Sequence, residues 1–292
     1  MHKSNLESKR VLSFRNDIIK KIPKFPNNRE TLNILESKSL SEILLYYTNW
    51  ASRLVPPRPR TVIIEPTLSL DPRWKDLAIN TNILLDKVRR GDDLTPYLSL
   101  KIKSKGFSPN TMGTGQNVDK WADKDFLLNI MGYHHFHLSH IVESKGHTKR
   151  SDEVLFAEVT RETFIAIGFF NHTVFEPPNI ISKSLEEEQE WLWHIFDVRS
   201  SRGVPSGSVY FPTLITTSGH RTQHTFLVNR YLRIIDEIEP KLDDISFVGS
   251  QFNIKNAKLA IKIKPTWYLN FLDLGIYDKR LNTFCIYQKC ML

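Results

Sequence analysis

Four of the ten histidines in this 292-residue chain fall within seven residues: His134, His135, His137 and His140. Histidine titrates near neutral pH and can both take up and donate a proton, so such a group suits acid–base chemistry. In an extended segment the side chains alternate between two faces, which places His135 and His137 side by side on one of them. This pair is therefore the first candidate for a catalytic centre.

Cleavage of RNA through its ribose 2′-hydroxyl could use such a pair. The reaction needs a base for the hydroxyl, an acid for the leaving 5′-oxygen and a cation for the charge of the phosphorane. We assign the proton transfers to His135 and His137 and the cationic role to Arg150, because arginine supplies a fixed, bidentate charge. His172 joins the catalytic set, because it ends a later strand-forming run where a loop can present it. The mechanism uses no metal or other cofactor.

Two other interpretations of the histidines stay open. Two histidines one residue apart on a strand can share a transition-metal ion, which would make the chain a metal-dependent hydrolase with His135, His137 and His172 as ligands. Other nearby side chains that could supply the third ligand are Asp152, Glu153 and His140. In the remaining interpretation the histidines pack against aromatic side chains, and the chain is a non-enzymatic protein that binds nucleic acid or another protein.

Positive charge is concentrated in the first part of the chain. The net charge is +8, and residues 1–120 hold 21 Lys and Arg against 12 Asp and Glu, whereas residues 121–180 hold 5 against 8. A cationic surface attracts polyanions, so we expect this first segment to hold RNA. Arg58 and Arg60, in the Pro-Pro-Arg-Pro-Arg stretch of residues 56–60, could contact its backbone; the stretch could equally be a rigid connection.

A second candidate anion site is predicted at the start of a helix over residues 218–239. His220 and Arg221 lie in its first turn, where backbone N–H groups without a helical partner can bind an anion. His224 shares a helix face with His220, which also fits a phosphate or metal site. The alternative is a serine-capped helix whose first turn happens to be basic.

The pattern of the whole chain predicts an α+β fold. Residues 131–139, 153–160 and 163–170 are short runs rich in aromatic and β-branched residues, typical of an antiparallel β-meander. Helical periodicity or helix-start signals mark the following segments: 30–55, 74–90, a helix from about 184, and 218–239. A short strand is expected at 61–65 and a hairpin pairing 266–276 with 283–288.

These elements suggest two domains joined by the Gly- and Asn-rich stretch 106–119. Residues 1–118 would form a basic, mainly helical region. Residues 119–292 would form a histidine-rich α+β domain, in which a central meander over 131–175 packs with the helices and hairpin of residues 180–292.

Part of the predicted meander resembles the last strands of RelE/HigB-type ribonuclease toxins. The resemblance covers about residues 134–176 and rests on the histidine-rich strand, the run D-E-V-L-F-A-E-V from Asp152 and the run F-I-A-I-G-F-F-N-H that ends at His172. It implies a compact sheet packed on helices, metal-independent cleavage of mRNA and a bacterial stress or phage-defence role. Arg150 would take the basic position after the first strand and His172 the polar position of the last. A protein antitoxin or inhibitor would then be a partner besides RNA.

Several classes of protein are disfavoured. No stretch reaches the roughly 18 consecutive apolar residues of a membrane-spanning helix, and the N-terminus lacks the apolar run of a signal peptide. With only Cys285 and Cys290, no disulfide framework is indicated, so we expect a cytoplasmic protein with free thiols and no membrane partner. Phosphate-binding loops, nucleophile elbows and the G-x-G-x-x-G motif are absent, which argues against nucleotide hydrolysis, α/β-hydrolase chemistry and dinucleotide-dependent chemistry.

Overall fold

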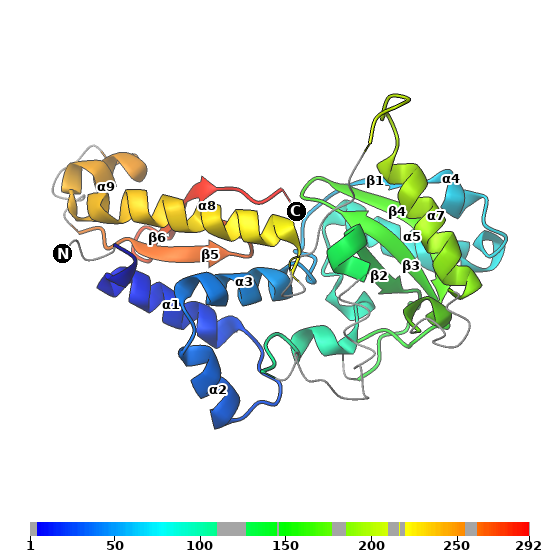
Figure 1. Cartoon of the computed structure of the whole chain (residues 1–292), viewed down its shortest axis with the longest axis horizontal. Coiled ribbons are helices and arrows are strands. Elements are labelled where there is room, and N and C mark those ends of the chain that lie inside the picture. Colours follow the sequence, from blue (N-terminus) through cyan, green and yellow to red (C-terminus); the bar gives the residue numbers. More distant parts are fainter. Residues whose placement is uncertain are drawn as a thin grey trace. The chain divides into compact units, whose positions relative to one another are not determined.

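The computed structural model describes residues 5–109, 127–144, 146–176, 185–209, 216, 220–254 and 262–291 (Figure 1). In this part of the chain, helices combine with a four-stranded mixed sheet and a three-stranded antiparallel sheet, so the predicted α+β class is confirmed. The chain divides into two compact units. The first unit consists of Met1–Ser52, Ser104–Thr111 and Gln223–Met291, and the second of Arg53–Lys103 and Met112–Thr222 with Leu292.

This division differs from the boundary near residue 118 that the sequence suggests. The N-terminal helices do not form a region of their own, because they pack with elements from the C-terminal part of the chain. The hydroxyl of Tyr47 donates to the carbonyl of Phe271 at 3.0 Å, and Arg10 Nε donates to Glu239 at 3.1 Å. Short amphipathic helices need another apolar surface to bury their own, and here a distant segment supplies it.

The second unit is built around the meander. Strands β2 (Tyr133–His137), β3 (Glu153–Val159) and β4 (Thr163–Asn171) are antiparallel neighbours, as predicted. The short strand expected near residue 61 is β1 (Thr61–Ile64), which pairs in parallel with β4. The sheet order is therefore β1-β4-β3-β2.

Both faces of this sheet are buried. On one face Phe136, Leu155 and Phe164 pack with Leu84 and Leu85 of helix α5 (Trp74–Arg90). The opposite face is covered by helix α7 (Glu187–Ser200) and the 3-10 turn η4 (His172–Phe175). Its cluster joins strand residues to the covering side chains: Tyr133, Val154, Phe156, Phe170, Val174, Phe175, Leu192, Ile195 and Phe196. Burial on both faces explains why β3 and β4 are nearly continuous apolar runs.

The remaining helices match the sequence patterns in part. Helix α5 has the predicted bounds and ends at Gly91, whose φ of 78° lies in the left-handed region. The single helix expected over residues 30–55 is wrong, because Ser39 and Glu42 form a capping box that starts a new helix. The other α-helices are α1 (Lys9–Lys21), α2 (Arg29–Glu36), α3 (Leu40–Ala51), α4 (Pro66–Ser69), α8 (Thr222–Ile238) and α9 (Ile245–Gln251). No helix in the described ranges is long and apolar enough to cross a membrane.

The C-terminal sheet belongs to the first unit. It consists of β5 (Thr266–Asn270), β6 (Asp273–Asp278) and β7 (Thr283–Gln288), in the order β5-β6-β7. The predicted single strand over 266–276 is wrong, because the chain reverses at Phe271, whose φ is 57°. The hydroxyl of Tyr231 from α8 donates to the carbonyl of Leu272 in this turn.

Candidate functional site

Three predicted catalytic histidines meet at one edge of the four-stranded sheet. The rings of His135 and His137 are 6.3 Å apart between centroids, and those of His137 and His172 are 5.8 Å apart and stacked. His137 ends β2, and His172 directly follows β4. Because β2, β3 and β4 alternate in direction, the end of β2 and the end of β4 lie at the same edge. Alternation along β2 therefore places His135 and His137 together, as expected. The antiparallel order of the strands brings His172 beside them.

The face of the sheet that carries the histidines is packed rather than open. Catalysis by His135 and His137 together would need a solvent-accessible hollow around both side chains. His137 is only 3% exposed, while His135 and His172 are partly exposed. Phe175 lies 4.9 Å from His135 and 5.9 Å from His172 between ring centroids. The physical reason is that η4 and α7 close over this face of the sheet. Solvent therefore reaches the two outer rings and not the central one.

A hydrogen bond fixes the orientation of His172. Its Nδ1 lies 2.9 Å from the backbone carbonyl oxygen of Asp152. A carbonyl oxygen can only accept, so Nδ1 carries the proton. In the neutral ring, Nε2 then has a lone pair that can accept a proton, which is the state that a general base requires.

Arg150, the predicted cationic partner, is exposed. Its charge acts on a different histidine: burial, then Lys103, then Arg150 lower the pKa of His147. The three clustered rings contact one another, Phe156 and Phe175. These contacts give no support to a clamp formed by Arg150 at the histidine pair.

Sequence reasoning missed Arg73, which organises the same sheet edge. Its five N–H groups all have acceptors: two go to Asp71, one to the carbonyl of Phe169, one to Glu153 and one to Glu188. Hydrogen bonds to Asp71 are the largest cause that raises the pKa of Arg73. Glu153 is the residue after Asp152, so Arg73 supports the segment that holds His172. With every donor used, Arg73 fits a positioning role rather than binding of phosphate.

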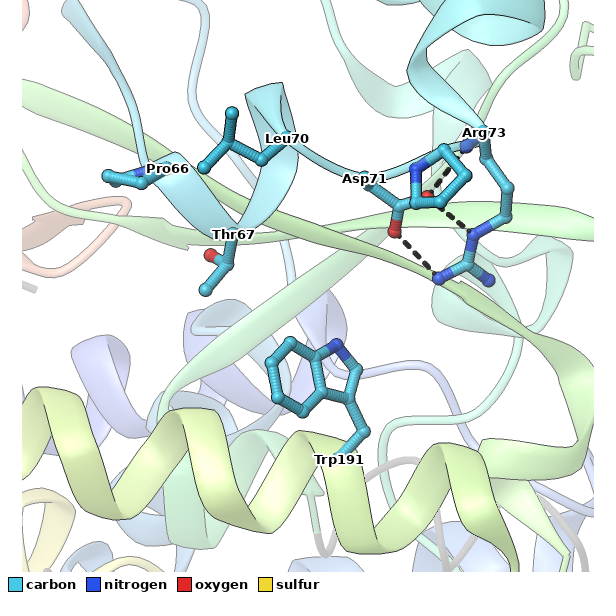
Figure 2. A pocket seen from close by; sticks show the side chains of 7 residues that line it. Pro66, Thr67, Leu70, Asp71, Arg73 and Trp191 are labelled. Carbon is cyan, nitrogen blue, oxygen red and sulfur yellow. Dashed lines mark hydrogen bonds and ion pairs between the residues drawn. The ribbon is translucent and has the colours of Figure 1, made fainter.

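A pocket of about 580 Å³ lies beside Arg73 (Figure 2). Figure 2 shows Trp191 of α7 facing the segment that carries Thr67 and Leu70, with the Asp71–Arg73 pair alongside. The lining residues are Pro66, Thr67, Leu70, Asp71, Pro72, Arg73 and Trp191. Three carboxylates surround the one guanidinium, and burial raises the pKa of Glu188 among them. Because the guanidinium is already shared among these carboxylates, the cation that lines the pocket is not available to an RNA phosphate.

A second ion-pair network lies at the opposite edge of the same sheet. Arg199 of α7 contacts Glu65 and donates to Glu158 at 2.6 Å, and Arg202 donates to both oxygens of Glu65 at 3.0 and 2.9 Å. The hydrogen bond from Arg202 is the largest cause that lowers the pKa of Glu65. Together the two networks attach α7 to the sheet near both of its ends.

The predicted nucleic-acid contacts are mostly buried. Arg60 is 6% exposed and donates to the carbonyls of Thr160, Pro56 and Arg58 at 2.9 to 3.2 Å. The structure thus supports a rigid connection for residues 56–60 rather than a phosphate contact by Arg60. Arg58 is half-buried.

The predicted anion site before α8 is also enclosed. His220 is 9% exposed, and burial and the charge of Arg53 lower its pKa. Burial also lowers the pKa of Arg221, whose guanidinium lies against Gly132. His224 is fully buried. These side chains do not form an open surface for an anion.

Within the described ranges, no group of three or more His, Cys, Asp or Glu side chains is arranged to hold a metal ion. The metal-site interpretation of His135, His137 and His172 therefore gains no support from this geometry. Comparisons with protein-family models, curated proteins and solved structures find no match to the chain. The likeness to ribonuclease toxins accordingly stays a prediction.

Proposed function

We propose that this chain is a metal-independent endoribonuclease that cleaves RNA through attack of the 2′-hydroxyl, in a bacterial toxin or phage-defence role. The observation that supports the proposal best is the contact sequence His135–His137–His172, with Nδ1 of His172 held by a backbone carbonyl. A protein antitoxin or inhibitor would be a second partner besides RNA.

The exposure of the rings suggests how they divide the work. His172 takes the proton of the 2′-hydroxyl at Nε2 while the oxygen bonds to phosphorus. His135, in its protonated form, donates from Nδ1 to the 5′-oxygen as the P–O5′ bond breaks, because its Nε2 is buried from solvent. The products are a 2′,3′-cyclic phosphate and a 5′-hydroxyl. His137 lies between the two rings and contacts both of them. Because it is only 3% exposed, it positions the other two histidines and does not itself meet the RNA.

The same burial favours a second candidate function. Aromatic packing around His135 and the enclosure of His137 are what a structural role for the histidines would produce. In that case the chain is a non-enzymatic protein that binds nucleic acid. The two functions differ in whether bound RNA is cut.

Cleavage of a 5′-labelled single-stranded RNA by the purified full chain, with and without EDTA, tests the proposal. We expect chelator-resistant cleavage that leaves cyclic phosphate ends. His172→Asn keeps a donor for the Asp152 carbonyl but removes the titrating group, so it should lower the rate by about 10²- to 10⁴-fold. His135→Ala should do likewise.

His194→Ala is the matched control, because His194 is exposed on α7 and stacks on Trp191 away from the cluster. It should leave the rate unchanged. RNA that is bound but never cut would favour the non-enzymatic function, and cleavage abolished by EDTA would contradict the metal-independent mechanism.

A further inference from the structure

The first unit carries the whole net charge of the protein. Its three segments contain 20 Lys and Arg against 12 Asp and Glu, whereas the second unit contains 20 of each. The excess of +8 therefore belongs to the unit that does not contain the histidine cluster. A binding surface for a polyanion is best sought there.

One face of the C-terminal sheet exposes aromatic rings. Tyr268 of β5 is 39% exposed, and its ring centroid lies 5.7 Å from that of Tyr277 on β6 and 5.6 Å from that of Phe284 on β7. Gly275 pairs directly with Tyr268, and a Cβ there would lie 2.8 Å from the ring of Phe284. The absence of a side chain at Gly275 thus lets the rings lie close together over all three strands.

The charged side chains in this part of the chain are divided by exposure. All five cations of residues 262–291 are exposed: Lys262, Lys264, Lys279, Arg280 and Lys289. The two carboxylates of the same stretch, Asp273 and Asp278, are 5% and 1% exposed. Asp278 accepts hydrogen bonds from the backbone N–H groups of Lys264, Arg280 and Leu281. The surface of this stretch is therefore purely cationic.

Positively charged side chains also lie close to the aromatic rings. The ammonium of Lys21 on α1 lies 4.4 Å from the ring centroid of Tyr268. Lys264 precedes β5 at the same alternation as the exposed Thr266 and Tyr268. Asp278, which orders the turn after β6, brings Lys264 and Arg280 to one end of the sheet.

We propose that this aromatic face binds single-stranded nucleic acid. Unpaired bases stack on Tyr268 and Phe284, and the phosphates lie along Lys264, Lys279 and Arg280. Aromatic stacking combined with positive charge is how proteins hold single strands without reading their sequence. Paired bases in a duplex do not expose their faces, so a duplex binds more weakly. The inference does not depend on the proposed cleavage, because it concerns other residues in the other unit.

Fluorescence anisotropy with labelled oligonucleotides tests it. The full chain carries His172→Asn, so that any RNA stays intact, and is titrated with a 12-mer of U, a 12-mer of dT and a 12-base-pair duplex. We expect at least one of the two single strands to bind more tightly than the duplex. Which one does so depends on whether ribose or deoxyribose fits the aromatic face. Tyr268→Ala should raise the Kd for the single strand by about 5- to 150-fold, because stacking contributes roughly 1–3 kcal/mol per base. Tyr268→Phe should restore binding.

Two further variants guard against a simple folding defect. Phe226→Ala removes an aromatic ring that is 68% exposed on α8 and should change the Kd less than about twofold if binding is confined to the sheet face. Lys279→Ala should lower the slope of log K against log salt by about 0.7. The proposal is overturned if no single strand binds, if the duplex binds as tightly as the single strands, or if folded Tyr268→Ala binds like the parent. Binding of a single-stranded RNA by the chain with His172 intact, without any cleavage, would instead count against the proposed nuclease alone.

Discussion

Arg73 offers the sharpest test of how the histidine edge is held. Its guanidinium pairs with three carboxylates at once, those of Asp71, Glu153 and Glu188. Replacement by Met keeps much of the apolar stem but leaves these three negative charges facing one another. We therefore expect Arg73→Met to destabilise the second unit and to loosen the segment that orients His172.

The size of the effect follows from burial. Removing one partner of a fully buried ion pair costs about 3–5 kcal/mol, and Arg73 is 28% exposed, so solvent reduces the expected cost to about 2–3 kcal/mol. Without Arg73, the pKa of Glu188, already raised by burial, rises further above the unfolded value near 4.3. The penalty is complete above this raised folded pKa, shrinks as the pH falls from it towards the unfolded value, and is absent below both. The cost should thus be smaller at pH 5 than at pH 8.

Urea unfolding followed by circular dichroism at pH 8 and pH 5 measures both quantities. Arg89→Met is the matched control, because the Arg89–Asp86 pair is 48% and 57% exposed and should contribute less than about 1 kcal/mol. If Arg73→Met costs no more than Arg89→Met, or costs the same at both pH values, the ion network does not hold this edge and the reasoning fails.

Three further predictions concern stability. A Cβ on Gly275 would overlap the carbonyl oxygen of Cys285, so Gly275→Ala should lower the free energy of unfolding by about 1–3 kcal/mol in urea denaturation; an unchanged value would show that β6 and β7 can separate freely. Burial and Arg53 lower the pKa of His220, so the unfolded chain binds a proton below pH 6.5 that the folded chain resists. Stability should fall there by up to about 1.4 kcal/mol per pH unit, and His220→Gln should flatten that slope between pH 7 and 5. Arg60→Met should reduce the melting temperature and leave the Kd for RNA unchanged, since Arg60 donates to backbone carbonyls. Weaker RNA binding by the folded variant would show that Arg60 contacts RNA after all.

The local elements of the fold could be predicted where the pattern is complete within a short segment. Helix α5 shows apolar residues at helical spacing and ends in a glycine, and strands β3 and β4 are short, nearly continuous apolar runs. Competing local signals caused the errors. Leucine and isoleucine recur across residues 30–55, but one helix ends at Glu36 and the capping box of Ser39 and Glu42 begins another. The serine and glutamate of this capping box are visible in the sequence and were the available signal for a break between two helices.

Alternation placed His135 and His137 on one face, but it could not show what covers that face. The covering side chains come from η4 and α7, which follow much later in the chain, and nothing in the spacing of β2 specifies that packing. For the same reason the sequence did not reveal the Arg73 network. Its partners come from three separate segments, and only their meeting in the fold distinguishes Arg73 from the other arginines.

Charge counted along the chain led to a different picture from charge counted within the folded units. Residues 53–103 contribute ten of the cations that make the first 120 residues basic, yet they fold with the acidic segment 112–222 into a unit with no net charge. The remaining excess lies with residues 1–52 (+4), Lys105 (+1) and residues 262–291 (+3). The proposed binding of a polyanion and the proposed proton transfer therefore involve residues of different units, so each should survive the loss of the other. Separate binding and cleavage measurements on Tyr268 and His172 variants can consequently assign the two properties independently.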